Sequence, residues 1–531
     1  MLYRFEAFTV GQGNVGAQPE LKTDPTWVCT EQRALWVLPT DHPIGQGAKK
    51  HFHELHNDAT VADIALAHRE GFESVEHLKR YTTTGMGTDQ GKTANVNALV
   101  IMAALQGKPI DAIGTTTFRP PYTPLSFGSI VGPHVGPQFL QRRTTPMQPW
   151  HDGQDAVYED VGDWLRPRYF PRPGESMHDA VQRECLAVRN EVGILDATTL
   201  GKIDIQGRDA GRLLDMVYTN RWSKLGIGKC RYGLMLNEHG MVIDDGVTSR
   251  LGERHFHMTT TTGGAARVLG WLEELLQTEW PDWEVYCTSV TEQWAVMALN
   301  GPKARTLLSG LTDADLSPQA LPFMTFINAE VAGVPARIFR ISFTGESAFE
   351  VNVPARYGLH VWEAIQTAGQ AVNLTTYGTE AMHVLRAEKG FIIVGQDTDG
   401  AVTPHDLGME HMISKRKTDF IGKRSLSRSD TARPGRKQLI GLLTDDPDAV
   451  LPEGAHIVAE SDNAPPMTAL GHVSSSYLSP NCGRAIAMGL LKNGLNRLGE
   501  RVNIALMDGR LQTATVTTPV FFDPDGERAR S

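Results

Sequence analysis

The stretch RYGLMLNEHGMVIDDGVTSR, residues 231–250, decides the fold of the larger part of this chain. Its pattern predicts a β-hairpin, in which a first strand leads to a turn at Asn237–Gly240 and a second strand starts at Met241. Asp244 and Asp245 are adjacent in the second strand, and successive side chains of a strand point to opposite faces. One carboxylate can therefore enter a pocket while the other faces solvent or the backbone of a turn. Taken alone, the pair favours the plainer interpretation of two carboxylates on a solvated edge.

Around this hairpin, residues 180–430 alternate between short strands and helices, as in strand-like GKIDIQG, helix-like AARVLGWLEELLQ and strand-like WAVMAL. The polar stretch SDTARPGRKQ predicts a linker near 428–437. Beyond it, strands separated by turns about every ten residues predict a compact antiparallel β-barrel over 437–523. The fold class that we expect is therefore α+β, ending in a barrel.

The first part of the chain is organised differently. Residues 1–50 mix Gly, Pro and polar residues and predict an irregular lead-in. Apolar residues at helical spacing in DATVADIALAHREGFESVEHLKRYT and NVNALVIMAALQG predict a small helical domain over 51–125, with helix ends at Gly71 and Gly107. Proline and aromatic residues crowd the stretches FRPPYTPLSFG and RPRYFPRPGES, which predicts an extended connector over 126–179 that wraps a neighbour.

Composition excludes several classes of protein. At 531 residues the chain is too long for one core, so three or four domains are expected. A formal net charge of -10 argues against nucleic acid as the main partner, because phosphate binding needs a basic surface. The five cysteines are far apart and include no C-x-x-C pair, which argues against a disulfide framework, a zinc ribbon and an iron–sulfur cluster. Without a long apolar run or a signal peptide, we expect a cytoplasmic protein that does not enter a membrane.

Three motifs suggest sites that the surrounding sequence does not support. GQGNVG at residues 11–16 has the glycine spacing of a dinucleotide-binding loop, but Pro19 follows where a helix N-terminus is needed. GMGTDQGKT resembles a phosphate-binding loop with one glycine displaced, and linker glycines are the better interpretation. The histidines of HFHELH, residues 51–56, lack a carboxylate or cysteine pattern that would complete a site, so no metal is expected.

Further motifs carry a resemblance to a known family. LPFMTF, FTGESAFEVNV and YGTEAMHVLRAEKGF follow one another at the spacings of the glycine-cleavage T-protein, or aminomethyltransferase, family. LNGPKARTLL resembles the strand–Gly-Pro–helix element of that family, and GHVSSSYLSPNCGRAIAMGLL resembles its carboxy-terminal domain. This resemblance covers about residues 180–522.

Other stretches lie outside the plain T-protein pattern. EGFESVEHLKRYTTTGMGTDQGKTANVNAL, GTTTFRPPYTP, MTTTTGGAARVLGWLEELLQ and LRAEKGFIIVGQDTDG resemble the carboxy-terminal half of the alpha subunits of heterotetrameric sarcosine oxidases. By the same resemblance, the helical stretch is a degenerate ferredoxin-like domain, of the type called A3 in these oxidases. The sequence has no cysteine between Cys29 and Cys185 that could ligate a cluster there.

The resemblance implies an enzyme, the folate-binding subunit of a 5,10-methylenetetrahydrofolate-forming sarcosine oxidase. Oxidation of an N-methyl amine gives an iminium, whose carbon hydrolyses to formaldehyde in water. Tetrahydrofolate N5 can capture that carbon instead where water is excluded and the reactants are held close. Tetrahydrofolate is thus the expected cofactor of this chain. Flavin (FAD or FMN) is expected only in a partner, the beta subunit, which smaller oxidase subunits accompany.

The resemblance also assigns roles to residues. Asp245 is expected to take a proton as positive charge develops on the folate, and Glu350 is expected to bind the amino-pyrimidine edge of the pterin. Tyr232 is expected to stack on the pterin, with a buried aromatic of the hairpin as the alternative.

The chain departs from the T-protein pattern at two positions near this site. The arginine that T-proteins usually have four residues before Arg386 is Met382 here. Arg386 is either a folate ligand or one half of a structural ion pair with Glu388, and both interpretations stay open. The family's pocket asparagine is replaced within Thr259–Thr262, and Thr261 is expected to contact folate there.

The amino-terminal half of such alpha subunits, with a ferredoxin-like fold and a dinucleotide-binding domain, has no counterpart in this sequence. We therefore expect a chain that is truncated, split across two genes or specialised. Two alternatives stay open: a standalone aminomethyltransferase of the T-protein type, and a non-catalytic folate-binding fragment. The sequence does not specify the amine substrate or the oligomeric state.

Overall fold

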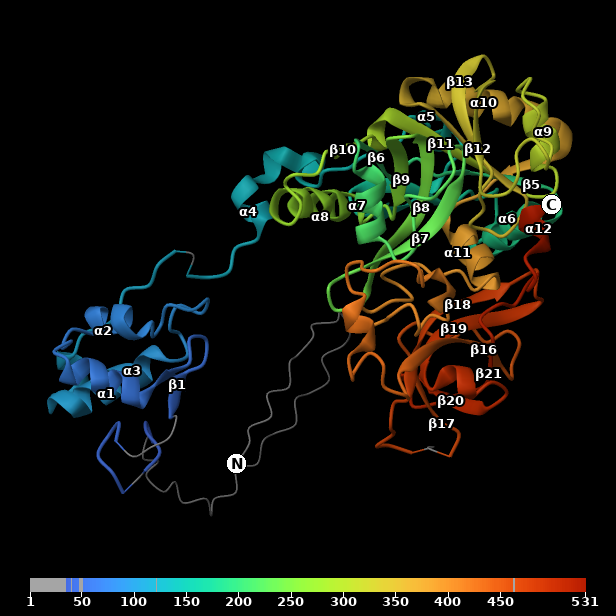
Figure 1. Ribbon diagram of the computed structural model, residues 1–531. Helices are drawn as coiled ribbons and strands as arrows, with labels where there is room; N and C mark the ends of the chain where they lie inside the picture. Colours follow the sequence, from blue (N-terminus) through green and yellow to red (C-terminus); the bar gives the residue numbers. More distant parts are fainter. Residues whose placement is uncertain (1–34, 40, 47–50, 121, 462–463) are drawn as a thin grey trace. The chain divides into compact units, whose positions relative to one another are not determined.

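The computed structural model describes residues 35–39, 41–46, 51–120, 122–461 and 464–531 (Figure 1). The chain divides into two compact units, Met1–Leu140 and Gln141–Ser531, and each unit is described by itself. The glycine motif at residues 11–16 and Cys29 lie outside the described residues.

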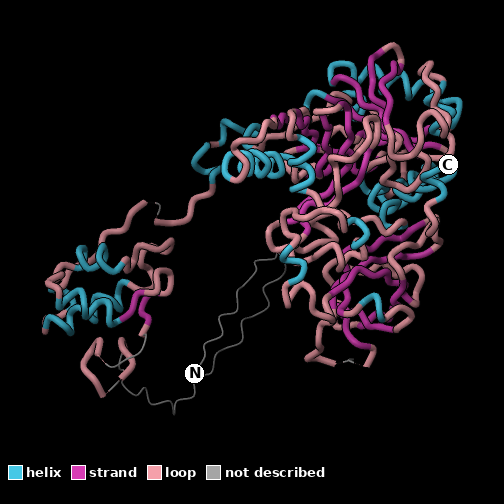
Figure 2. The backbone as a smooth tube through the Cα atoms, viewed as in Figure 1, coloured by secondary structure: helices cyan, strands magenta, loops and turns pink. Residues whose placement is uncertain are grey.

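The described part of the first unit is built mainly from short helices and loops, which Figure 2 draws in cyan and pink. Its elements are β1 (Phe52–Glu54), β2 (Ala59–Thr60), α1 (Val61–Arg69), α2 (Val75–Thr82), α3 (Asn95–Gln106) and α4 (Phe127–Val131). The side chains of Thr60 and Asp63 cap each other's backbone at the start of α1. Gly71 (φ +94°) follows α1 and Gly107 (φ +62°) ends α3, so both helix ends use the left-handed backbone that favours glycine. The helices predicted in this region are confirmed.

The second unit contains two sheets and a barrel. The first sheet has the strand order β10-β6-β9-β8-β7, and the second has the order β12-β13-β14-β11-β5-β15. The strands of the first sheet are β6 (Gly201–Gln206), β7 (Cys230–Leu236), β8 (Val242–Gly252), β9 (His255–Thr260) and β10 (Tyr286–Ser289). Those of the second are β5 (Val192–Asp196), β11 (Trp294–Asn300), β12 (Phe326–Val331), β13 (Val334–Phe339), β14 (Ala348–Pro354) and β15 (Leu374–Thr376). The hairpin predicted around residues 231–250 is β7–β8 of the first sheet.

Helices cover these sheets because strand side chains alternate between two faces. Along β11, Met297 belongs to the apolar cluster that includes helices α9 (Ala304–Ser309) and α10 (Gly358–Gly369). The neighbouring Ala298 belongs to a different cluster, with helices α6 (Met177–Asn190) and α11 (Thr379–Glu388). The first sheet packs instead on α7 (Ala210–Val217) and α8 (Ala265–Thr278). The second sheet therefore has helices on both of its faces, whereas the apolar cover of the first sheet comes from α7 and α8.

The barrel is closed by six strands, which are orange to red in Figure 1. They are β16 (Lys437–Thr444), β17 (His456–Ala459), β18 (Gly471–Ser479), β19 (Arg484–Lys492), β20 (Arg501–Ala505) and β21 (Leu511–Thr517). Ile440 and Ala487 fill its interior, whereas the adjacent Leu439 and Ile486 share a cluster with Leu234 of the hairpin β7–β8. The outer face of the barrel therefore packs beside the hairpin.

The α+β class and the terminal antiparallel barrel agree with the sequence-based expectation. The expected connector differs, because it is not extended throughout. It contains the helix α5 (Gln148–Asp152) and the antiparallel hairpin of β3 (Val157–Val161) and β4 (Trp164–Tyr169). Within the described ranges, no helix is long and apolar enough to cross a membrane.

Candidate folate site

A large cavity of about 1970 Å³ is lined by residues of both sheets, of α11 and of the barrel. It is polar at a few points and apolar elsewhere, which is the usual character of a small-molecule site. Its volume exceeds the roughly 300–1,000 Å³ of an ordinary ligand pocket, so two reactants fit in it together.

The hairpin β7–β8 presents its two aspartates to opposite sides. Asp244 lies opposite Met235 in the ladder and is fully buried, while Asp245 lies opposite Leu234 and lines the cavity. The alternation along the strand is as predicted. The interpretation of a solvated edge is wrong, because neither carboxylate lies on an open surface.

Asp245 is held by Tyr232 of the neighbouring strand, whose hydroxyl donates to Oδ2 at 2.6 Å. Burial raises the pKa of Asp245 to about 7, although the Tyr232 hydrogen bond acts in the other direction. Burial and the Asp245 charge raise the pKa of the Tyr232 phenol well above its ordinary value. A carboxyl with a pKa about 7 can both accept and return a proton at neutral pH.

Asp244 organises the adjacent loop. Thr261 donates to it twice, from its backbone N–H at 3.2 Å and from its hydroxyl at 3.1 Å. The Thr261 hydroxyl also accepts the N–H of Gly264 at 3.1 Å. A Cβ at Gly264 would stand 1.8 Å from Asp244 Oδ2, so only glycine fits at this close approach. Thr261 does lie on the cavity wall, but its hydroxyl is already used within the loop.

Glu350 enters the cavity from the other sheet. On β14 it pairs with Ala298 of β11, which in turn pairs with Leu195 of β5, and all three residues line the cavity. Burial raises the pKa of Glu350 to about 7, and the distant Lys202 offsets this only in part. No described residue forms a hydrogen bond or ion pair with its carboxylate. This acceptor is therefore available to a ligand.

Arg386 was open to two interpretations, a folate ligand and one half of a structural ion pair. Arg386 is fully buried and does not line the cavity. It forms an ion pair with Asp397 at 2.5 Å and donates to Ser475 of the barrel at 2.7 Å. The structural interpretation is therefore favoured, with Asp397 in place of Glu388 as the partner. No local sequence pattern indicates this partner, since Asp397 and Ser475 lie outside α11.

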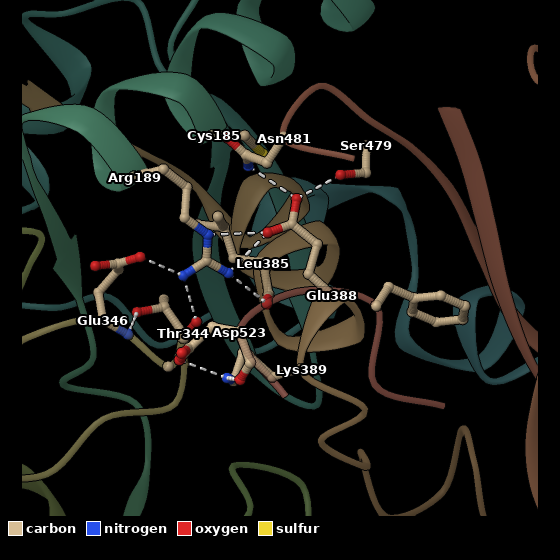
Figure 3. Close-up of polar contacts among 12 residues, drawn as sticks. Cys185, Arg189, Thr344, Glu346, Leu385, Glu388, Lys389, Ser479, Asn481 and Asp523 are labelled. Atoms are coloured by element: carbon tan, nitrogen blue, oxygen red, sulfur yellow. Dashed lines mark hydrogen bonds and ion pairs between the residues drawn. The ribbon is translucent and has the colours of Figure 1, made fainter. Parts of the chain in front are cut away.

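Glu388 belongs to a separate buried network, drawn in Figure 3. Arg189 of α6 lies between Glu346 at 2.8 Å and Glu388 at 2.7 Å. The other oxygen of Glu388 accepts from Ser479 at 2.6 Å and Asn481 at 2.8 Å, both in the barrel. The network therefore joins α6, α11 and the barrel around one buried guanidinium.

Some residues that line the cavity were not expected from the sequence. Phe343 and Phe391 lie there with nearly parallel rings, 6.3 Å apart between centroids. Phe343 begins the motif FTGESAFEVNV and Phe391 ends the motif YGTEAMHVLRAEKGF, but a pair of aromatic residues in two distant loops has no local pattern that would reveal it. Arg166 of β4 also lines the cavity and is buried.

The histidine-rich stretch of the first unit has acidic neighbours in space. Glu54, His56 and Asp89 bring ligand atoms within 4.8 Å of one another. However, Glu54 already accepts the backbone N–H groups of His56 at 3.0 Å and Asn57 at 2.8 Å, as a turn-forming carboxylate does. We propose no metal there.

Comparison with known proteins supports this view of the fold. The family model of the GCVT N-terminal domain matches residues 147–417. The model of the glycine cleavage T-protein C-terminal barrel domain matches 437–523, and that of the sarcosine oxidase A3 domain matches 48–133. The crystal structure of the glycine cleavage system aminomethyltransferase T from Bartonella henselae has the same fold, with a TM-score of 0.63 and 24% sequence identity over 72% of this chain and 98% of that chain. The chain belongs to the glycine cleavage T-protein family.

Within that family, the chain is similar over most of its length to sarcosine oxidase alpha subunits. The chain is 51% identical to the sarcosine oxidase subunit alpha of Corynebacterium sp. strain U-96, over 94% of its own length and 52% of that subunit. It is 44% identical to the subunit of Rhizobium meliloti, over 93% of this chain and 50% of that one. An aminomethyltransferase of Listeria monocytogenes is 30% identical over 71% of this chain and 97% of that enzyme. The chain spans about half the length of the sarcosine oxidase subunits that it matches.

Proposed function

We propose that this chain is the folate-binding part of an alpha-type sarcosine oxidase subunit. It transfers the one-carbon unit of an oxidised N-methyl amine, sarcosine, to tetrahydrofolate and so gives 5,10-methylenetetrahydrofolate. One observation carries the proposal: two carboxyl groups from different sheets, Asp245 and Glu350, line one large cavity, and both have a pKa of about 7. The similarity to sarcosine oxidase alpha subunits supports the choice of reaction.

The chemistry of the ligand fits these groups. The amino-pyrimidine edge of a pterin presents two adjacent N–H donors, which a carboxylate accepts side by side. Glu350 has no protein partner, so it is the group that we assign to this edge. The cavity has room for a folate and for the iminium from which the carbon comes.

Asp245 then moves a proton. The N5 lone pair of the folate attacks the iminium carbon, and Asp245 accepts the proton that N5 loses as it becomes positively charged. When N10 displaces the amine, the amine leaves with the proton that Asp245 returns and with the proton of N10. The iminium and tetrahydrofolate thus become methylenetetrahydrofolate and a protonated amine, with no change of oxidation state. Oxidation of the original amine requires a flavin, which we assign to a partner subunit.

A standalone aminomethyltransferase is the second candidate. It is favoured by the Listeria monocytogenes relative, almost all of which is matched by this chain. Against it, the match of residues 48–133 to the sarcosine oxidase A3 domain has no place in a plain T-protein pattern. Capture of a flavin-bearing partner on the tagged chain would support the oxidase. Transfer from an aminomethyl carrier without any partner would support the aminomethyltransferase.

The folate anchor is tested by Glu350→Gln, which keeps the shape of the side chain but replaces one acceptor oxygen by a donor. Loss of a hydrogen bond to a charged group corresponds to a fall in tetrahydrofolate affinity of about ten- to a hundred-fold. Titration calorimetry measures the affinity for tetrahydrofolate. Glu330→Gln, an exposed glutamate on β12 of the same sheet, is the matched control and should bind as the wild type does. Equal affinity for Glu350→Gln and wild type would contradict the assignment.

The proton acceptor is tested by Asp245→Asn in the complex with the flavin-bearing partner. Folate binding should persist, because the change is isosteric. Methylenetetrahydrofolate formation should fall by about 10²–10⁴, the usual contribution of a positioned general base. Free formaldehyde should rise in its place while peroxide stays constant.

Asp244→Asn separates this effect from a loss of fold. Asp244 holds the loop at Thr261, so its variant should lower the melting temperature and weaken folate binding together. If Asp245→Asn gave that same pattern, or left product formation unchanged, Asp245 would not be the proton acceptor.

A further inference from the structure

Arg166 is a buried cation that faces the cavity without a protein partner. It lies on β4, lines the cavity and has only 8% of its surface exposed. Its Nε has no hydrogen-bond partner, and across the described ranges no residue forms an ion pair with its guanidinium. A buried guanidinium in this state is costly unless a ligand supplies the missing acceptors.

The two carboxylates whose charges act on Arg166 already accept hydrogen bonds from other residues. Glu159 accepts the hydroxyl of Thr379 at 2.5 Å. Asp196 accepts from Thr145 at 2.6 Å and from His151 at 3.0 Å. Both act on Arg166 through their charge only, without a direct contact. The guanidinium therefore keeps its donors for another group.

The other basic groups around the cavity are paired, neutral or less buried than Arg166, and Arg221, which also lines it, is only half-buried. Lys389 is paired with Asp523 at 2.9 Å, and Arg231 donates to the carbonyl of Arg221. Arg267 is largely exposed and donates to a backbone carbonyl. His383, beside Arg166, has its pKa lowered to about 3 by burial and by the charges of Arg386 and Arg166, so it stays neutral. Arg166 thus combines burial, a permanent charge and free donors.

We infer that Arg166 binds a carboxylate of a ligand in this cavity, because a planar guanidinium with free donors matches a carboxylate in a two-point pair. The inference rests on the proposed function, in which two ligands carry such a group. One is the glutamyl tail of the folate, and the other is the α-carboxylate of the amino acid that supplies the carbon. Met382, which also lines the cavity, is uncharged and therefore offers that group no second cation.

The test uses Arg166→Gln and three probes in titration calorimetry on the full chain. The probes are tetrahydrofolate, tetrahydropteroate (the same molecule without its glutamate) and glycine added to folate-saturated protein. Arg168→Gln is the matched control, since Arg168 lies two residues along the same strand but pairs with Glu380 and does not line the cavity. If Arg166 binds the glutamyl tail, its variant loses about ten- to a hundred-fold in affinity for tetrahydrofolate and none for tetrahydropteroate.

If Arg166 binds the amino acid, folate affinity stays constant and glycine binding to the loaded protein is lost. Unchanged affinity for all three probes in the folded variant would overturn the inference. Arg166→Lys keeps the positive charge but lacks the planar pair of donors, so it should lose an intermediate amount of affinity for the same probe. It also provides a second test where the Gln variant does not fold. The proposed function has a different test: it would be contradicted if the wild-type protein did not bind tetrahydrofolate at all.

Discussion

The Tyr232 hydroxyl donates a hydrogen bond to Asp245, and this contact affects the balance between the protonated and the ionised form of the carboxyl group. Burial favours the protonated form, while the phenol donates to the ionised form and so favours the charge. The resulting pKa of about 7 places the group between acid and base at neutral pH. Tyr232 is thus a positioning residue, in addition to any contact that it makes with the pterin.

Tyr232→Phe removes this hydrogen bond and should raise the pKa of Asp245 further. Because the transfer needs the ionised form, the rate of methylenetetrahydrofolate formation should become half-maximal at a pH about one unit higher than in the wild type, which corresponds to about 1.4 kcal/mol. The pH profile of the reconstituted complex measures this shift. Tyr286→Phe, an exposed tyrosine on β10 of the same sheet, should leave the profile in place. A Tyr232→Phe profile that overlays the wild type would remove Tyr232 from this role.

At the level of residues, the sequence could predict what depends on local pattern. The strand alternation at Asp244 and Asp245 is such a case, because it follows from the two-residue period of a strand. The partners of Arg386 are not, because Asp397 and Ser475 come from a following loop and from the barrel. Arg166 was missed for the same reason, since its isolation is visible only when the surrounding elements are in place.

The helix α11 is the element that connects the sheets with the barrel. Arg386 on this helix contacts Ser475 of the barrel. Glu388, two residues further on, contacts Ser479 of the barrel and also pairs with Arg189 of α6 (Figure 3). All of these groups are buried, so each charge depends on its partners for compensation.

Glu388→Ala should therefore lower the free energy of unfolding by about 3–5 kcal/mol, the usual effect of removing one partner from a buried ion pair. Urea unfolding of the whole chain measures it. Glu380→Ala on the same helix breaks the partly exposed pair with Arg168, and should change stability by less than about 1 kcal/mol. Equal losses in the two variants would mean that the Arg189 network adds nothing beyond the helix itself.

The elements that the sequence did not predict share a physical cause. The hairpin β3–β4 contains Pro167. Proline in a sequence argues against a strand, because it has no backbone N–H to donate to the hydrogen bonds between strands. A two-stranded sheet is all edge, so proline is tolerated there. The helices and barrel strands, in contrast, were predicted from sustained periodicity and turn residues, which are local signals.

At the scale of the whole molecule, the two compact units divide the chain between residues 140 and 141. The residues that line the cavity run from Glu159 to Val520, so the proposed site belongs entirely to the second unit. The apolar cluster of the first unit is built from its own residues, among them Ile64 and Met102. Each unit thus has the core that independent folding requires.

We expect residues 141–531, expressed alone, to bind tetrahydrofolate with the affinity of the full chain. The physical reason is that Asp245, Glu350 and Arg166 are all positioned by elements of this unit. Calorimetry on the fragment and on the full chain measures the two affinities, and Glu350→Gln in both should weaken binding by the same factor of about ten to a hundred. A fragment that folds, as judged by a cooperative melting transition, yet binds at least tenfold more weakly would contradict this assignment. In that case residues 1–140 would have to contribute to the folate site directly.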